Sequence, residues 1–492
     1  MHTEATPFDL LPSLNRNNAQ IIMHLPRMIS NAAIVPVILA WSDVFPRQSS
    51  TTITVDVTKK FQTMDGFGFA EAFQRANVVV NLPAQQQREV LDLLFNTTTG
   101  AGMTILRIGI GSSPDSSSDH MNSIQPKNPG GPTAAPKYVW DGKDSGQVFV
   151  AKEAYARGVR SFYAIAWSAP GYMKTNGNEN NGGYLCGVTG QSCSNGDWKQ
   201  AFANYLTQYV KYYQEEGINI THLGFLNEPE FAASYAGMLS SGTQAASFIK
   251  VLSPTLAAAN LSSVGLTCCD SEGWSNQGSM TSQLRSAGAE TLLSTITSHA
   301  YTSGPSSPLS TSRRVWQTEN ADLNGAWQAK WYSSGGAGEG MRWASLIHST
   351  VVNSNCSAYL YWIGVQSGTT NSKLISVSGS TYSVSKRLWA FAQFARGATP
   401  GAVRVGTSGG SFSTSAYLNV DGSLSVLVLN TGSSASAVSI GTQGFNTGTK
   451  AKATAWVTDN TRDYAALVVD WAGGVVNGTV PSRAMVSFIL SP

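Results

Sequence analysis

The chain has 492 residues, of which 42% are hydrophobic and only 12% are charged, so it can hold one large domain and a smaller one. Its net charge is +3, and without a concentrated basic stripe this argues against a nucleic-acid partner. No apolar run reaches the ~18 residues that a membrane span needs, so we expect no membrane partner.

The segment 1–49 has the pattern of an N-terminal extension followed by a secretory signal. Residues 29–41 are small and apolar and follow Arg27, as in a signal peptide. The charged part of this signal begins near Met23 or Met28. We therefore predict a secreted, extracellular protein whose mature chain begins near Gln48. Sequons support a glycosylated product and occur at Asn96, Asn219, Asn260, Asn355 and Asn477.

Short apolar strands alternate with longer helical stretches from Gly66 onward. This alternation predicts a parallel α/β domain, and its eight strands predict a (β/α)8 TIM barrel. The predicted strands are Gly66–Glu71, Met103–Ile110, Ser161–Ser168, Thr221–Asn227, Ser263–Cys269, Leu293–Tyr301, Arg314–Glu319 and Ala358–Gly364. Helical patterns lie between them, for example at Gln85–Phe95, Trp198–Glu216, Ala245–Ala259 and Gly340–Asn353.

From about Pro400 the helical pattern stops, and short β-rich runs alternate with Gly/Ser turns. We predict a small antiparallel β-sandwich over 401–492, completed by an N-terminal strand within 50–64, with the catalytic barrel over 65–400. The runs are Ser411–Leu418, Leu424–Leu429, Ala435–Gly441, Ala453–Thr458 and Met485–Leu490. A structural cap is favoured over a sugar-binding module, because few tryptophans are present to stack on sugars.

Five cysteines fit an oxidising compartment. Cys186 and Cys193 lie in a Gly/Asn-rich loop and could close a small disulfide. Cys268 and Cys269 are adjacent, so we do not expect them to bridge each other without strain, and Cys356 is a distant candidate partner. The odd count leaves one thiol over. No CxxC or CxxH pair exists, and we expect neither a metal nor a cofactor.

Two of the predicted strands turn from apolar to acidic at their carboxyl ends, at Glu228 and Glu319. (β/α)8 enzymes place catalytic groups at this end. The glutamates lie 91 positions apart, from 228 to 319, close to three strand–helix units of ~31 residues, so both would face one pocket. Such a pair is the apparatus of a glycosidase, with Glu228 as acid/base and Glu319 as nucleophile. One isolated glutamate would more often cap a helix or pair with arginine, but the Asn-Glu-Pro context and the spacing favour catalysis.

Other side chains at this rim could contact a sugar. Asn227 could hydrogen-bond a 2-OH, and Arg107 could hold Glu319 ionised. His299 fits an orienting donor better than a base, because the glutamates already cover proton transfer. Aromatic side chains there could form a subsite floor or pack in the core, and these are Trp167, Tyr301 and Trp362. A Ser/His/Asp hydrolase is disfavoured, because no G-x-S-x-G elbow lies between a predicted barrel strand and a helix.

Over roughly residues 50–492 the chain resembles glycoside hydrolase family 30, and within it the fungal xylanase branch. The stretches that carry the resemblance are 61–68 (FQTMDGFG), 166–174 (AWSAPGYMK), 226–229 (LNEP) and 361–364 (YWIG). The resemblance implies a barrel with a side β-sandwich and a retaining mechanism, with the same roles for Glu228 and Glu319.

That branch acts on β-1,4-xylan, often glucuronoxylan, so the resemblance implies a polysaccharide partner. Arg75 resembles an arginine that follows the first strand in this branch, and its guanidinium could bind a uronate carboxylate; an ordinary solvated arginine is the alternative. Asn122 could close the non-reducing side of the cleft. Endo against exo action stays open, as do β-1,6-galactan and β-1,6-glucan as substrates. A non-catalytic sugar-binding protein would predict loss of one glutamate, and both are present. We expect a monomer.

Overall fold

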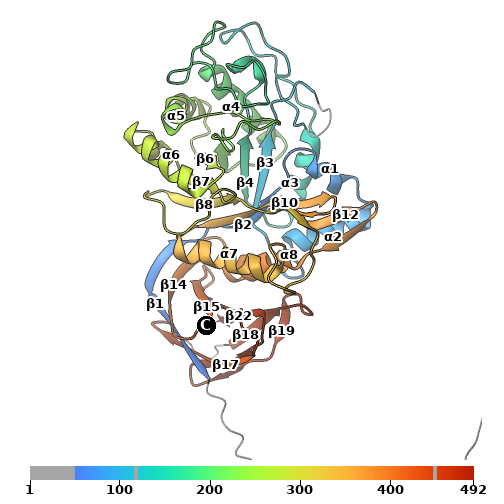
Figure 1. Cartoon of the computed structure of the whole chain (residues 1–492), viewed down its shortest axis with the longest axis vertical. Coiled ribbons are helices and arrows are strands. Elements are labelled where there is room, and N and C mark those ends of the chain that lie inside the picture. Colours follow the sequence, from blue (N-terminus) through green and yellow to red (C-terminus); the bar gives the residue numbers. More distant parts are fainter. Residues whose placement is uncertain (1–49, 116–119, 447–451, 492) are drawn as a thin grey trace, which may run out of the picture. The chain divides into compact units, whose positions relative to one another are not determined.

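The computed structural model describes residues 50–115, 120–446 and 452–491; the predicted secretory signal lies outside these residues. Within them, eight parallel strands close into a barrel (Figure 1), because β10 pairs with both β2 and β8. The predicted (β/α)8 barrel is therefore confirmed, with each predicted strand shifted only at its ends. The barrel strands are β2 (Gly66–Ala70), β3 (Ile105–Ile110), β4 (Ser161–Ala166), β5 (His222–Gly224), β6 (Gly265–Ser271), β7 (Thr295–His299), β8 (Arg314–Glu319) and β10 (Ala358–Ser367).

Helices cover the barrel where amphipathic patterns predicted them. In α4, Phe202, Leu206, Tyr209 and Tyr213 are buried at the spacing of one helix face. No helix in the described residues has the length and apolar character of a membrane span. The helices there are α1 (Arg75–Val80), α2 (Ala84–Phe95), α3 (Gln147–Ala156), α4 (Lys199–Glu215), α5 (Gly242–Ala258), α6 (Trp274–Ser286), α7 (Gly340–Asn353) and α8 (Lys386–Gly397), with the 3-10 turns η1 (Asp144–Gly146), η2 (Gly171–Met173) and η3 (Glu290–Leu292).

Short strands extend the carboxyl-terminal side of the barrel sheet. β12 (Lys373–Ser378) pairs in parallel with β10, and β13 (Thr381–Val384) pairs antiparallel with β12. A separate ribbon joins β9 (Asp322–Ala326) to β11 (Thr370–Asn371). This ribbon begins just after Glu319, so it borders the site.

The second sheet forms the β-sandwich and draws in strand β1 (Thr51–Thr63). β1 lies between β14 and β17, antiparallel to the first and parallel to the second. The parallel pair differs from the predicted antiparallel sandwich, because no short hairpin joins β1 to its neighbours and fixes its direction. The other strands are β14 (Val403–Ser408), β15 (Ser413–Leu418), β16 (Leu424–Asn430), β17 (Ser436–Gln443), β18 (Lys452–Thr458), β19 (Ala465–Leu467), β20 (Asp470–Ala472), β21 (Val475–Val480) and β22 (Ala484–Ser491).

Helix α8 joins the sandwich to the barrel. It contacts β2 and β12 of the barrel sheet and β16, β18 and β22 of the sandwich, and Figure 1 shows it between the two. Gln393 on this helix is fully buried; its amide donates to Thr458 Oγ1 at 2.9 Å, and its carbonyl accepts from the Ser487 hydroxyl. Almost all of α8 is buried, as its place between the two sheets requires.

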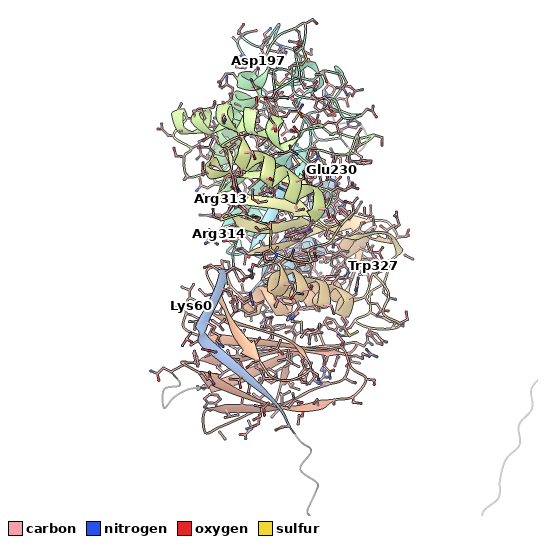
Figure 2. All side chains as sticks on the ribbon, turned by 60° about the vertical axis from the view of Figure 1, so that its left-hand side comes forward. Lys60, Asp197, Glu230, Arg313, Arg314 and Trp327 are labelled. Carbon is pink, nitrogen blue, oxygen red and sulfur yellow. A yellow bond between two sulfur atoms is a disulfide. The ribbon has the colours of Figure 1, made fainter. Side chains whose placement is uncertain are left out.

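The amino ends of the barrel strands are held together by Asp65, which precedes β2. Its carboxylate pairs with Arg314 at the start of β8 and accepts from Trp316 Nε1 at 2.8 Å. Figure 2 labels Arg314 at this end, and Glu230 where the chain leaves the opposite end of β5. The opposite end is therefore the one that is free to carry a site.

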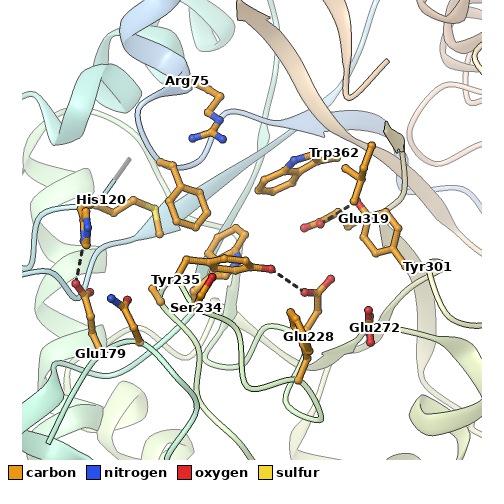
Figure 3. Close-up of a pocket in the computed structure, with 17 residues that line it drawn as sticks. Arg75, His120, Glu179, Glu228, Ser234, Tyr235, Glu272, Tyr301, Glu319 and Trp362 are labelled. Atoms are coloured by element: carbon orange, nitrogen blue, oxygen red, sulfur yellow. Dashed lines mark hydrogen bonds and ion pairs between the residues drawn. The ribbon is translucent and has the colours of Figure 1, made fainter. Parts of the chain in front are cut away.

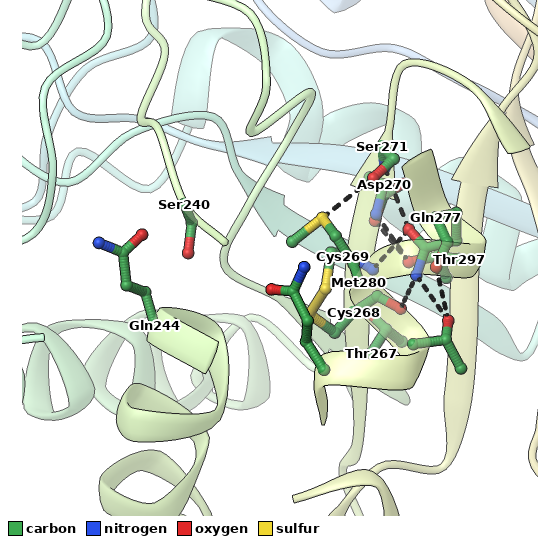
Figure 4. Close-up of a disulfide and its surroundings, with 12 residues drawn as sticks. Ser240, Gln244, Thr267, Cys268, Cys269, Asp270, Ser271, Gln277, Met280 and Thr297 are labelled. Carbon is green, nitrogen blue, oxygen red and sulfur yellow. Dashed lines mark hydrogen bonds between the residues drawn. A yellow bond between two sulfur atoms is a disulfide. The ribbon is translucent and has the colours of Figure 1, made fainter. Parts of the chain in front are cut away.

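Two disulfides lie in the described residues. Cys186–Cys193 forms as predicted. The prediction that Cys268 and Cys269 would not bridge each other is wrong, because these neighbours are disulfide-bonded on β6 (Figure 4). The peptide between them is cis and their Cα atoms lie 3.0 Å apart, the spacing of a cis bond. Cys356 is buried as a free thiol.

Candidate active site

A cavity of about 500 Å³ lies at the carboxyl ends of the barrel strands (Figure 3). Asn227, Arg107 and His299 are buried directly behind its wall. Asn122 lies elsewhere: it forms a backbone bridge with Ser113 and lines a separate hollow. The predicted site residues that line the cavity itself are Glu228, Glu319, Trp167, Tyr301, Trp362 and Arg75.

Glu228 sits on a sharp turn at the end of β5. Its φ is +49°, a left-handed conformation that residues other than glycine rarely adopt and that recurs at functional sites. The turn is held on both sides, because Glu228 N donates to Asp270 O at 2.8 Å and Phe231 N donates to Glu228 O at 2.9 Å. With 7% of its surface exposed, the side chain is fixed facing the cavity.

Glu319 ends β8 and is 5% exposed. Arg107 on β3 forms an ion pair with Glu319 Oε2, and the Tyr301 hydroxyl donates to Oε1 at 3.1 Å. The second guanidinium nitrogen of Arg107 donates to Asn227 Oδ1 at 2.7 Å. Arg107 thus fixes the predicted nucleophile and the residue before the predicted acid/base together.

The carboxylate oxygens of the two glutamates approach each other closely. One carboxylate oxygen from each, with a ring nitrogen of His299, lie within 4.8 Å of one another. Retaining enzymes hold their carboxyl groups about 5–5.5 Å apart, whereas inverting enzymes need about 6.5–9.5 Å to admit a water. The separation therefore fits direct attack by one carboxylate on the sugar.

His299 bridges Glu228 to a buried aspartate that sequence reasoning missed. His299 Nδ1 lies 2.9 Å from Glu228 Oε1, and Nε2 lies 3.2 Å from Asp270 Oδ1. Asp270 occupies a register shift in β6, with φ +50°, which turns it into the barrel interior. Its carboxylate also accepts from Thr318 Oγ1 at 2.5 Å and Thr297 Oγ1 at 2.7 Å. Asp270 therefore orients the imidazole of His299 from the side of the barrel interior.

The charges of this cluster shift one another's pKa. Burial lowers the pKa of His299, but the charge of Glu319 and the hydrogen bonds to Asp270 and Glu228 outweigh it and raise the pKa to about 10. Burial raises the pKa of Glu319, and the positive charges of His299 and Arg107 oppose that rise. His299 therefore carries both ring protons at neutral pH and donates in both directions.

Aromatic side chains form the apolar part of the cavity wall. Phe73 packs edge-on against Trp167 and Trp362, with ring centroids 5.2 and 6.3 Å apart, and Arg107 lies 4.6 Å from the Trp167 ring centroid. Trp167 is almost fully buried and also lines the cavity, so it packs in the core and forms part of the cavity wall. Tyr235, also missed from the sequence, donates its hydroxyl to Glu228 Oε2 at 3.3 Å.

The end of the cavity away from Glu319 carries Arg75 and a second polar cluster (Figure 3). There His120 Nδ1 lies 3.0 Å from Glu179 Oε1, and Ser112 Oγ donates to Glu179 Oε2 at 2.7 Å. Sequence reasoning named neither His120 nor Glu179, because both lie in loops with no periodic pattern. This end offers charged and hydroxyl-binding groups to a sugar lodged beyond the glutamates.

Glu228, His299 and Glu319 also present donor atoms that could surround a metal ion. A ligating imidazole must have a free, unprotonated ring nitrogen. Both ring nitrogens of His299 are engaged, its pKa is raised to about 10, and Arg107 already places positive charge on Glu319. The arrangement suits proton transfer better than ion binding.

Comparison with known proteins identifies the family. The profile for "Glycosyl hydrolase family 59" matches residues 64–396, and that for "Glycosyl hydrolase family 30 beta sandwich domain" matches residues 401–488. The catalytic domain of GH30 xylanase C from Talaromyces cellulolyticus is 47% identical, with a TM-score of 0.84 over 90% of this chain and 100% of that one. The chain belongs to glycoside hydrolase family 30. The family 59 profile covers only the barrel, whereas the Talaromyces likeness extends through the sandwich, so the predicted resemblance to family 30 is confirmed.

Two further relatives are named for a different substrate from that of the Talaromyces xylanase. An endo-1,6-β-D-glucanase of Aspergillus fumigatus is 26% identical over 425 residues, 78% of this chain and 82% of the relative. Another, from Trichoderma harzianum, is 28% identical over 232 residues, 44% of this chain and 45% of the relative. As a family 30 member the protein is an O-glycosyl hydrolase.

Proposed function

We propose that this family 30 member hydrolyses β-1,4-xylosidic bonds in xylan and glucuronoxylan with retention of configuration. The observation that carries the retaining chemistry is the pair Glu228 and Glu319, whose oxygens approach within 4.8 Å in one cavity. The likeness to the Talaromyces xylanase, at 47% identity, supports xylan as the substrate. We further propose that the enzyme is secreted, glycosylated and monomeric.

The proposed reaction takes two displacements at the same sugar carbon. In the first, the Glu319 carboxylate attacks C1 while Glu228 gives its proton to the glycosidic oxygen; the bond to the leaving sugar breaks and a glycosyl ester forms. In the second, Glu228 takes a proton from water, whose oxygen attacks C1 and releases Glu319 as a carboxylate. Two inversions at C1 leave the β configuration unchanged.

The residues around the glutamates support these steps. Arg107 and Tyr301 hold Glu319 and favour its ionised form. Because Asn227 Oδ1 accepts from Arg107, its amide nitrogen is left to donate to the sugar 2-OH, a bond that strengthens in the transition state. The His299 cation donates to Glu228 and aims its carboxyl group at the glycosidic oxygen.

Arg75 is proposed to bind the uronate of a glucuronoxylan branch. It lines the cavity on the side away from Glu272 (Figure 3), and its guanidinium carbon lies 5.5 Å from the Phe73 ring centroid. A guanidinium fork suits a planar carboxylate better than a lysine would.

A second candidate is hydrolysis of β-1,6-glucan. The Aspergillus relative that is named an endo-1,6-β-D-glucanase covers 78% of this chain. The lower identity of this relative, 26% against 47% for the xylanase, places this activity second.

The deciding experiment incubates the purified enzyme with glucuronoxylan, arabinoxylan, β-1,6-glucan and β-1,6-galactan, and resolves products by thin-layer chromatography. We expect xylo-oligosaccharides, with uronate-bearing products from glucuronoxylan. Proton NMR of the first products should show the β anomer before mutarotation. Release of gluco-oligosaccharides from β-1,6-glucan alone would replace xylan by the second candidate, and an initial α anomer would contradict the double displacement.

A further inference from the structure

Glu272 is a cavity-lining carboxylate to which the proposed reaction gives no task. It follows β6 and lies beside Glu228, on the side of the cavity away from Arg75 and His120 (Figure 3). Its backbone is fixed, because Glu272 N donates to Glu230 Oε1 at 2.8 Å and Tyr301 N donates to Glu272 O at 2.9 Å. The side chain therefore projects from a rigid support between the catalytic strand ends.

The protein gives this carboxylate no partner. Across the described residues, no hydrogen bond or ion pair reaches the Glu272 side chain. Burial and the neighbouring charge of Glu228 raise the pKa of Glu272, and the charge of His299 opposes that rise. A polar group held in a cavity without a protein partner is readily satisfied by donors on a ligand.

The hydroxyl groups of the leaving sugar are the hydrogen-bond donors that can satisfy the Glu272 carboxylate. Arg75 and His120 line the cavity on the side away from Glu272 (Figure 3). Phe231 lines the same cavity as Glu272, with 44% of its surface exposed. A sugar offers an apolar face and a rim of hydroxyls, which match an exposed ring beside a carboxylate.

We propose that Glu272 and Phe231 form the subsite for the leaving sugar. Glu272 accepts hydrogen bonds from the hydroxyls of that sugar, and its negative charge excludes a sugar that carries an acidic branch. Arg75 then places a positive charge on one side of the scissile bond, and Glu272 places a negative charge on the other side. A uronate is attracted on one side and repelled on the other, which fixes where a branched chain is cut. This inference rests on the proposed glycosidase reaction, but not on the identity of the polymer.

The test compares Glu272→Ala and Glu272→Gln with a matched control, Glu230→Gln. Glu230 is a neighbouring carboxylate that binds the Glu272 amide and does not line the cavity. Each variant is assayed on unbranched xylo-oligosaccharides, on an aryl β-glycoside of xylobiose, and on uronate-branched xylo-oligosaccharides. The aryl glycoside has no hydroxyls in the leaving group, so it isolates the contact in question.

We expect Glu272→Ala to lower kcat/KM on unbranched oligosaccharides about 10- to 100-fold, the effect of losing a hydrogen bond to a charged group, and to change the aryl glycoside less than about twofold. Glu272→Gln keeps the acceptor but loses the charge. It should therefore retain most activity on unbranched chains and newly release products in which the uronate-bearing sugar was in the leaving position, as read by mass spectrometry.

Three outcomes would overturn the proposal: an equal loss on aryl glycoside and oligosaccharide, unchanged kinetics for both Glu272 variants, or the same pattern from Glu230→Gln. The first outcome would mean that Glu272 acts by changing the acidity of Glu228. The third would mean that the effect comes from a disturbed loop backbone and not from a contact with the sugar. If β-1,6-glucan is the substrate, the comparison is run on β-1,6-gluco-oligosaccharides and an aryl glucoside. The leaving-sugar role is then still decided, while the uronate part fails with the proposed function.

Discussion

At the scale of single residues, two cations and three carboxylates are buried together beside the cavity. Arg107 and the His299 cation supply the positive charges, and Glu228, Asp270 and Glu319 are the carboxylates in contact with them. If all three carboxylates were ionised, the cluster would carry one excess negative charge in a low-dielectric site, which is costly. The cluster is neutral when one of its three carboxyl groups carries a proton, and one proton is what the first step of the proposed reaction consumes.

The two glutamates proposed as catalytic should respond differently to amide substitution. Glu319→Gln should abolish hydrolysis of all substrates, because an amide cannot form the glycosyl ester, while circular dichroism shows an unchanged fold. Glu228→Gln should lose far more activity on xylan than on activated aryl glycosides, whose leaving groups need little acid assistance. Initial rates on both substrates decide the roles, and equal losses for Glu228→Gln would remove it from the acid position.

His299 should make stability depend on alkaline pH. Its pKa in the folded protein is about 10, above the ~6.5 of an unfolded chain, so its stabilising contribution is complete below ~6.5 and is lost as pH rises through about 10. We therefore expect Tm of the wild type to fall between pH 8 and pH 10.5 more steeply than Tm of His299→Gln. Parallel slopes in differential scanning calorimetry would contradict a protonated His299.

Arg75 should act only on substrates with an acidic branch. Arg75→Ala is expected to lower kcat/KM on glucuronoxylan by roughly 10- to 100-fold, the value of a charge-assisted pair of ~1.5–3 kcal/mol, and to leave unbranched xylo-oligosaccharides nearly unchanged. Arg75→Lys, which keeps the charge without the fork, should recover only part of the loss. A loss of the same size on both substrates would make Arg75 a scaffold residue.

At the scale of elements, the strand ends were the predictable part of the site and the loops were not. Parallel strands buried on both faces read as continuous apolar runs, so the change to a charged residue marked Glu228 and Glu319. The same change at Asp270 was overlooked, because the predicted strand stopped at Cys269 and the register shift in β6 leaves no trace in the sequence. Tyr235 and Glu272 lie in irregular loops, where only the folded backbone brings them to the cavity.

The short turn η1 contains a carboxylate whose charge should weaken the fold. Asp144 Oδ2 accepts from Tyr209 Oη at 2.5 Å and Tyr213 Oη at 2.7 Å, and burial raises its pKa to about 6. The stabilising contribution of protonated Asp144 is fully present below pH ~3.8 and is lost as the pH rises through about 6. Asp144→Asn keeps an acceptor and suits φ +48°. It should therefore raise the free energy of unfolding at pH 7.5 by up to about 3 kcal/mol.

The gain in the free energy of unfolding from Asp144→Asn should shrink as the pH falls, because the Asp144 carboxyl group of the wild type then becomes protonated and loses its charge. Urea unfolding of Asp144→Asn and wild type at pH 7.5 and pH 4.5 gives the comparison. A gain that is the same at both pH values would show that Asp144 is not ionised at neutral pH in the folded protein.

At the scale of the whole molecule, an apolar cluster joins the barrel to the sandwich, beside the sandwich's own core. Phe394 on α8 and Leu427 on β16 belong to the same buried cluster, and Gln393 bonds to two sandwich strands. We expect one calorimetric unfolding transition for both parts. Gln393→Ala, which leaves Thr458 and Ser487 without their partner, should cost about 1–3 kcal/mol and lower that single Tm. A variant that unfolds in two separated transitions would show that the two parts are independent.

Strand β1 sets an order of events during synthesis. It leaves the ribosome at the start of the folded region, yet its partners β14 and β17 begin only at Val403 and Ser436. At ~5–20 residues per second, β1 waits roughly 20–70 s for the first of them. During that time its backbone is an open edge, able to pair with the β1 of a neighbouring nascent chain on the same messenger. Lys59 and Lys60, near the end of β1 that leads into the barrel, place like charges on any such pair and help to keep these chains apart until the sandwich closes.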